Sequence, residues 1–188
     1  QKAATLLEEQ ANKSLEEVTG HYGEISSARI FSLYGWGRLG KFRHFGECLE
    51  EYLRDARRRG DRYFEATSVR YGHRNYLARG KPEVAKAEIQ RAIWPAKVGA
   101  FHIQHWYELE AMCQIALYEG KIQDTLNDQG MRFHGLEHSL LLRVQTIRIS
   151  AQWLKARLLV AVVPESGEDD LVNFQQAIKL CKKLEKEK

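Results

Sequence analysis

Apolar positions recur along the chain every three to four residues, which is the period of amphipathic helices, and short turn signals separate the periodic segments. The clearest turn signal is the dipeptide Gly-Lys, which begins at residues 40, 80 and 120 and therefore repeats every forty residues. Each dipeptide follows one periodic segment and precedes another. The pattern predicts three helix–turn–helix blocks, at 21–60, 61–100 and 101–140.

The helix after each turn carries residues at spacings of four, four and three, which places them on one helix face. They are Phe45, Leu49, Leu53 and Ala56; Ala85, Ile89, Ile93 and Ala96; Thr125, Gln129, Phe133 and Leu136. The helix before each turn has two columns three positions apart, Leu33/His73/Cys113 and Trp36/Tyr76/Ala116. We expect both sets to form the core, and the third block is the weakest match because Thr125 and Gln129 are polar.

Further helices are predicted on both sides of the blocks. A leading helix over 2–19 has its stripe at Leu7, Ala11, Leu15 and Val18, and a last helix over 167–185 has its stripe at Leu171, Phe174, Ile178 and Cys181. Between the blocks and the last helix, a long helix over 139–163 begins at the potential N-cap Ser139 and ends at Pro164. No segment has a strand pattern. The prediction is an all-α fold, an α-solenoid of antiparallel helix pairs in a single domain, 1–188.

The composition is that of a folded globular protein, with 44% hydrophobic and 29% charged residues among 188 and a formal net charge of +4. This mild positive excess permits acidic partners but does not require nucleic acid. The most apolar stretch, 140–163, contains Arg143, Arg148, Lys155 and Arg157. We therefore interpret it as a buried helix rather than a membrane span, and expect no membrane partner.

Cys48, Cys113 and Cys181 are odd in number and far apart, with no Cys-x-x-Cys motif and no His/Cys pair at zinc spacing. They predict neither a disulfide framework nor a zinc finger, but small core residues in a reducing, cytoplasmic compartment. We expect no metal and no cofactor. The first residue is Gln1 rather than Met, which suggests a piece of a longer polypeptide.

Two short motifs suggest chemistry. Residues 35–40 read G-x-G-x-x-G, the pattern of a dinucleotide-binding turn, but such a site needs a preceding buried strand and a following acidic residue within a βαβ unit. Residues 134–138 read H-x-x-E-H, a zinc-protease pattern, although Gly135 and the potential cap Ser139 favour a helix end. No residue lies in a nucleophile motif. We expect no catalytic residue, and nucleotide binding or an enzymatic activity at residues 35–40 remains the alternative.

Two clusters have simpler interpretations. His102, His105 and Glu108 are three and six positions apart, so they spread around a helix and do not converge on a metal. The densest basic cluster could bind phosphates, but cations near a helix C-terminus also interact favourably with its dipole. Its members are Arg54, Arg57, Arg58, Arg59 and Arg62.

The blocks resemble tetratricopeptide repeats. The second block carries Tyr76, Gly80, Pro82, Glu83, Ala85, Ile89 and Ala92 in the order of the family's aromatic, turn and small positions, and the first block follows with Trp36, Gly40, Phe42, Phe45, Leu49 and Tyr52. Residues 101–107 and 139–144 also resemble segments in the C-terminal helical-repeat regions of multidomain bacterial serine/threonine protein kinases. These resemblances imply a right-handed solenoid that belongs to a larger signalling protein and contains no kinase catalytic motif of its own.

If the first helix of each block lines a groove, as the resemblance implies, its non-core positions would form a binding surface rich in arginine and tyrosine. The candidate groove residues are Tyr34, Arg38, Thr67, Arg70, Arg74, Tyr107, Glu110, Gln114 and Tyr118. Arginine with aromatic neighbours suits a carboxylate-bearing peptide. The predicted function is a non-catalytic protein-interaction or scaffolding module for an acidic segment; otherwise these residues form a solvated face or pack on another domain. The sequence assigns no oligomeric state.

Overall fold

The structure is a computed structural model that describes residues 1–17, 22–92, 94, 101–166 and 170–187. At residues 15–17, 163–166 and 170 it describes the backbone alone. Within these ranges the chain is helical and contains no strand, so the all-α class is confirmed. The chain divides into two compact units, Gln1–Trp94 and Pro95–Lys188, which are described separately.

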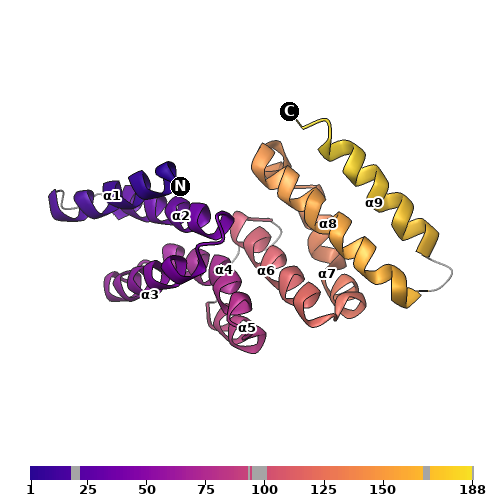
Figure 1. Ribbon diagram of the computed structural model, residues 1–188, viewed down its shortest axis with the longest axis horizontal. Coiled ribbons are helices and arrows are strands. Elements are labelled where there is room, and N and C mark those ends of the chain that lie inside the picture. Colours follow the sequence, from indigo (N-terminus) through magenta and orange to yellow (C-terminus); the bar gives the residue numbers. More distant parts are fainter. Residues whose placement is uncertain (18–21, 93, 95–100, 167–169, 188) are drawn as a thin grey trace. The chain divides into compact units, whose positions relative to one another are not determined.

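The first unit consists of consecutive helices (Figure 1). They are α1 (Lys2–Glu17), α2 (Tyr22–Arg38), α3 (Phe42–Arg59), α4 (Arg62–Ala78) and α5 (Pro82–Arg91). Each of these helices packs on the next one, and α2 also packs on α4, the corresponding helix of the following block. The central helix is α4, whose residues Ala66 to His73 are all buried.

Glycine ends the helices at the predicted turns. Gly40, Gly80 and Gly120, at the turns that the forty-residue repeat predicts, have φ of 68°, 69° and 73°, in the left-handed region that glycine adopts without strain. Gly60 has the same conformation, with φ of 70°, and closes α3 in a position that the repeat did not predict. The turn glycines of the first unit therefore recur every twenty residues, once per helix rather than once per pair.

The predicted inner faces of the first unit form its core. Phe45, Leu49, Leu53, Ala56, Ala85 and Ile89 are buried, as are Leu33, His73 and Trp36, whereas Tyr76 is half-buried. In the leading helix Ala11 is buried and Leu7 half-buried. Three predicted core residues, Val18, Ile93 and Ala96, lie outside the described residues.

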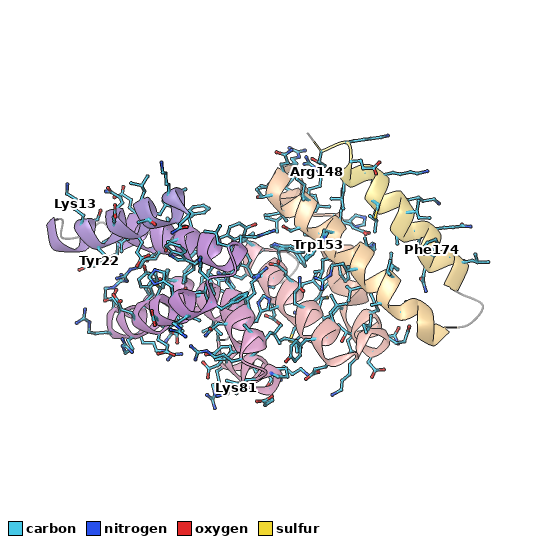
Figure 2. The ribbon with its side chains drawn as sticks, viewed as in Figure 1. Lys13, Tyr22, Lys81, Arg148, Trp153 and Phe174 are labelled. Atoms are coloured by element: carbon cyan, nitrogen blue, oxygen red, sulfur yellow. The ribbon has the colours of Figure 1, made fainter. Side chains whose placement is uncertain are left out.

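The second unit contains α6 (Ile103–Glu119), α7 (Ile122–Glu137), the short 3-10 helix η1 (Leu140–Arg143), α8 (Gln145–Ser166) and α9 (Asp170–Leu184). Its core is assembled mainly from α6, α7 and α8, through Trp106, Leu109, Cys113, Phe133, Leu136, Leu154 and Leu158. Thr125 and Gln129 are only half-buried, in keeping with their polarity. Arg148 of α8, which is labelled in Figure 2, pairs with Glu187, just beyond the end of α9.

The long helix predicted over 139–163 differs from the structure at both ends, so both predicted bounds are wrong. The Ser139 hydroxyl accepts a hydrogen bond from the Leu141 backbone N–H and so caps η1, and Val144 is extended before α8 begins at Gln145. Pro164 does not end α8, which runs to Ser166. Proline removes its own N–H from the helix and crowds the carbonyl four residues earlier, and α8 ends two residues after Pro164.

The apolar stripe of the last helix is not its buried face. Leu171, Phe174 and Ile178 are 70%, 49% and 40% exposed and Cys181 is exposed, whereas Ala177 is 2% exposed where α9 packs on α8. Phe174 is labelled on α9 in Figure 2. A small side chain allows two helices to approach closely, and this packing turns the larger apolar residues outward.

None of the described helices is both long and apolar enough to cross a membrane.

Candidate functional site

Two stacked tyrosines, each with an arginine beside its ring, lie across the contact between α2 and α4 in the first unit. The Arg38 guanidinium lies 4.9 Å from the centre of the Tyr34 ring, and its Nη2 donates a hydrogen bond to the Tyr34 hydroxyl across 2.6 Å. The Tyr34 ring stacks on Tyr71 with ring centres 5.4 Å apart, and the Arg74 guanidinium lies 4.2 Å from the centre of Tyr71. We call Arg38, Tyr34, Tyr71 and Arg74 the arginine–tyrosine ladder.

Helix spacing explains this arrangement. Tyr34 and Arg38 are four residues apart on α2, and Tyr71 and Arg74 are three apart on α4, so each pair shares a helix face. Gly37 lies beside the ladder, where an added Cβ would lie 3.3 Å from the Tyr71 hydroxyl oxygen. Its lack of a side chain lets the Tyr71 ring approach α2.

The ladder is graded in exposure. Tyr71 is 6% exposed, Tyr34 and Arg74 are half-buried, and Arg38 is exposed. The buried tyrosine anchors the ladder, Arg38 extends it towards solvent, and the Arg74 guanidinium is partly buried, with Nη1 shielded from solvent. A guanidinium over an aromatic ring retains its charge and N–H donors, which suits it to carboxylates. Among the predicted groove residues, the structure therefore brings together Tyr34, Arg38 and Arg74, and it adds Tyr71.

Three predicted groove residues are buried, which corrects their placement at non-core positions of a binding groove. Thr67 and Arg70 are 2% exposed and Glu110 is 7% exposed. The Thr67 hydroxyl donates to the Tyr63 carbonyl, and Arg70 Nη1 donates to the Ala66 carbonyl, both within α4. Because α4 is the central helix of its unit, neighbouring helices also bury its polar residues Thr67 and Arg70. A charge reversal at Arg70 would disturb the interior, so it is no test of peptide binding.

The remaining groove residues lie on α6 in the second unit. Tyr118 is 53% exposed and Tyr107 is half-buried. Gln114 is half-buried and its side-chain oxygen accepts a hydrogen bond from Arg157 of α8 across 2.9 Å. Gln114 therefore helps to join α6 to α8.

The glycine-rich segment 35–40 lies at the C-terminal end of α2. Gly35 and Gly37 are inside the helix, and Gly40 forms the turn after it. A phosphate-binding turn instead presents backbone N–H groups at the start of a helix. An added Cβ on Gly35 would lie 2.8 Å from the Cβ of Ala4, so this glycine allows α1 and α2 to pack closely. The motif is explained by packing.

The histidine motifs are engaged in local contacts. His102 caps α6, and His105 Nδ1 accepts a hydrogen bond from the His102 backbone N–H. In the H-x-x-E-H segment, which lies at the end of α7, Glu137 forms an ion pair of 2.7 Å with Lys155 of α8. His138 Nδ1 lies 2.9 Å from the His134 carbonyl oxygen.

The basic cluster is partly neutralised by carboxylates. Arg57 pairs with Glu65, and Arg58 and Arg59 both pair with Asp55. These three arginines occupy the last turn of α3, the end at which a helix dipole favours positive charge.

The cysteines differ in their surroundings. Cys48 and Cys113 are buried, as expected, and burial is the main reason that the pKa of each thiol rises to about 12. Cys181 is exposed, which contradicts the expected core position.

Sequence reasoning missed one group altogether. Within the described parts of the chain, the one set of potential metal-ligating side chains that converges is Glu8, His44 and Cys48. The sequence did contain a signal for this group, because His44 and Cys48 are four residues apart and so share one face of α3. This spacing contradicts the expectation that no His/Cys pair is spaced for metal binding. Glu8 comes from α1, far away in the sequence.

Comparison with known protein families, curated proteins and solved structures finds no match to this chain. The described residues place the chain in the all-α fold class.

Proposed function

We propose that the chain is a non-catalytic protein-interaction module of the tetratricopeptide-like, right-handed solenoid class, and that its first unit binds an acidic segment of a protein. The observation that carries this proposal is the arginine–tyrosine ladder across α2 and α4. These helices precede the turns of successive blocks, and they pack on each other as well as on α3 between them in the sequence. Equivalent helices in contact support the solenoid class.

The ladder has the features of a carboxylate-binding surface. Arg38 offers several N–H donors in one plane, and its contact with Tyr34 holds that plane over an apolar ring. A peptide carboxylate that pairs with the guanidinium can therefore bring its apolar atoms against the tyrosine. Such combined polar and apolar contacts are typical of residues that dominate protein interfaces.

The test is a titration of acidic, neutral and basic peptide pools, monitored by fluorescence anisotropy. Arg38→Glu should weaken binding of the acidic pool about tenfold or more, equivalent to about 1.4 kcal/mol, because it replaces attraction by repulsion. The matched control is Arg43→Glu, which makes the same charge change at an exposed position in the first turn of α3 whose side chain is not part of the ladder. The control should bind like the wild type apart from a small loss that added salt removes.

Two results would contradict the proposal. One is equal affinity of the wild type and Arg38→Glu for every pool. The other is an equal loss in both variants, which would reveal attraction to the net charge alone. Far-ultraviolet circular dichroism should be unchanged in both variants because the two side chains are exposed.

The wider context is also a proposal. The resemblance of residues 101–107 and 139–144 to kinase-associated repeats supports a place in a multidomain bacterial signalling protein of the cytoplasm, such as a serine/threonine kinase. The acidic segment would then belong to a protein partner or to another part of the same polypeptide. The complete reading frame that encodes this chain tests this placement, and a frame without any signalling domain would contradict it.

A further inference from the structure

Three potential metal ligands from two helices meet in the first unit. His44 Nε2 lies 2.9 Å from Glu8 Oε2, and Cys48 Sγ lies 3.5 Å from both His44 Nε2 and Glu8 Oε1. His44 and Cys48 are one turn apart on α3, and Glu8 projects from α1. Imidazole nitrogen, thiolate sulfur and carboxylate oxygen are the three ligand types that zinc accepts in proteins.

The spacing of the three side chains is close to that of a coordination sphere. Zinc bonds of about 2.0–2.3 Å at tetrahedral angles separate neighbouring ligand atoms by roughly 3.3–3.6 Å. The distance from sulfur to nitrogen already has this length. Glu8 faces the sulfur with Oε1 and the imidazole nitrogen with Oε2, so the carboxylate has to rotate to offer one oxygen to the ion, and the distance from nitrogen to oxygen has to open by roughly 0.4 Å. A deprotonated Cys48 and an ionised Glu8 together carry two negative charges, which balance a divalent cation.

Outer contacts orient the ligands. Trp36 Nε1 of α2 donates a hydrogen bond of 3.0 Å to Glu8 Oε2, and the Trp36 ring meets the His44 ring edge to face at 4.7 Å. Glu47 Oε2 lies 3.8 Å from His44 Nδ1, the ring nitrogen that faces away from the cluster. A carboxylate beside the second nitrogen of a metal-binding histidine is the usual outer-sphere arrangement.

The cluster combines a buried end with an open one. Cys48 is 5% exposed, whereas the side chains of Glu8 and His44 are 21% and 42% exposed. A cation can therefore enter past the imidazole and reach a sulfur that is shielded from solvent. Three protein ligands leave a fourth position for water.

The geometry does not suit covalent catalysis by Cys48. In a cysteine–histidine–carboxylate triad the histidine uses one ring nitrogen for the thiol and the other for the carboxylate. Here the same nitrogen, Nε2 of His44, faces both Glu8 and Cys48. Burial, followed by the charge of Glu8, raises the pKa of the Cys48 thiol to about 12, which disfavours a free thiolate nucleophile.

We propose that Glu8, His44 and Cys48 form a zinc site that fastens α1 to α3. Binding replaces the proton of the Cys48 thiol by a sulfur–zinc bond and releases that proton to solvent, with no change of oxidation state. The site rests on contacts within the first unit and is independent of peptide binding at the arginine–tyrosine ladder.

The test uses Co²⁺ as a spectroscopic probe and Zn²⁺ in calorimetry, both with the full chain at pH 7.5 under reducing conditions. We expect about one ion per chain, a near-ultraviolet thiolate-to-cobalt charge-transfer band, and loss of that band when zinc displaces cobalt. At a hundredfold excess over Kd, zinc should raise Tm by about 5 °C or more, because the ion binds the folded state.

Four variants assign the ligands. Cys48→Ser should abolish the charge-transfer band, and Glu8→Gln and His44→Gln should each weaken zinc binding about tenfold or more. Cys181→Ser is the matched control, since it removes an exposed thiol and should leave binding unchanged. Because the His44 side chain is 42% exposed, His44→Gln tests the site even if a core variant fails to fold.

The proposal is overturned if the wild type gives no charge-transfer band or zinc uptake. It is also overturned if the band persists in Cys48→Ser or disappears in Cys181→Ser, since the exposed cysteine would then be the ligand. The proposal also fails if both Glu8→Gln and His44→Gln bind zinc with wild-type affinity. The Cys48 thiol would then be the only ligand of the three.

Discussion

Arg29 donates a hydrogen bond from Nη1 to Asp55 Oδ2 across 2.6 Å and thereby joins α2 to α3 inside the first unit. The guanidinium is 2% exposed and also lies 4.4 Å from the centre of the Tyr52 ring. Burial is the strongest single influence on Asp55 and raises its pKa, but hydrogen bonds from Arg59, Arg29 and Arg58 together outweigh it and lower that pKa. Asp55 is therefore ionised at neutral pH.

The two partners should differ in their sensitivity to mutation. Asp55→Asn removes the negative charge from a buried arginine and should lower the free energy of unfolding by about 3 kcal/mol. Arg29→Met should lower it less, by about 1–2 kcal/mol, because Asp55 keeps its contacts with Arg58 and Arg59. Urea unfolding followed by circular dichroism measures both changes.

Arg58→Ala provides the control for this pair, since the Arg58 side chain is 82% exposed and its ion pair with Asp55 should contribute less than about 1 kcal/mol. An Arg29→Met variant that is less stable than Asp55→Asn would reverse the expected order and show that packing of the arginine, not its charge, dominates.

Much of the helical architecture could be predicted from local sequence. Glycine is the residue that adopts the left-handed conformation without strain, so Gly40, Gly80 and Gly120 mark their turns in the sequence. Apolar columns such as Phe45 and Leu49 reveal the buried face of a helix because burial follows the helical period.

Such patterns could not predict which helices pack on each other. Local sequence places Arg70 on the surface, but residues 66–73 of α4 are all buried. No local signal distinguishes a central helix with polar residues from an outer helix. On α9, periodicity identifies the stripe of Leu171 and Phe174 but not whether another helix covers it, and α8 packs against Ala177 instead. Sequence reasoning missed Tyr71 and Glu8, because the stacking of Tyr71 on Tyr34 and the contacts of Glu8 with His44 and Cys48 join residues distant in sequence.

The turn glycines lead to a second prediction, in which the same substitution has opposite effects at two positions of the second unit. Gly120→Ala should destabilise by about 1 kcal/mol, because φ is 73° and an alanine Cβ is strained there although no atom lies within 4 Å. Gly130→Ala should stabilise by about 0.5–1 kcal/mol, because Gly130 is solvent-exposed and lies in the middle of α7. An added Cβ there would also have no atom within 4 Å. Thermal unfolding measures both shifts, and equal shifts in the two variants would contradict the conformational explanation.

The contact between α3 and α4 leads to a third prediction. An added Cβ on Gly72 would lie 2.8 Å from Cδ2 of Leu49, whose side chain is held in the core at 2% exposure. Gly72→Ala should therefore destabilise by about 1–3 kcal/mol through overpacking. In the double variant with Leu49→Val, which shortens the opposing side chain, the two losses should be less than additive. Strict additivity in chemical denaturation would show that the close approach is not what requires glycine.

The last prediction concerns the pH dependence of stability and rests on His73 in α4. His73 is 1% exposed, and its Nδ1 lies 2.6 Å from the Arg70 carbonyl oxygen. Burial, followed by the positive charge of Arg74, lowers its pKa from 6.5 to about 3, while the hydrogen bond with the Arg70 carbonyl partly opposes this shift. The imidazole is therefore neutral in the folded protein at every pH above about 3.

The unfolded chain protonates His73 below pH 6.5, whereas the folded chain does not do so until about pH 3. The unfolded state thus binds more protons throughout this window, and stability must fall as the pH is lowered through it, by up to about 1.4 kcal/mol per pH unit. The free energy of unfolding from urea titrations at pH 7 and pH 5 should decrease more in the wild type than in His73→Asn, which cannot titrate. The comparison uses the difference between the two pH values, so a lower absolute stability of the variant does not affect it. Equal decreases in both proteins would mean that another group carries the dependence and that His73 is not held neutral by burial.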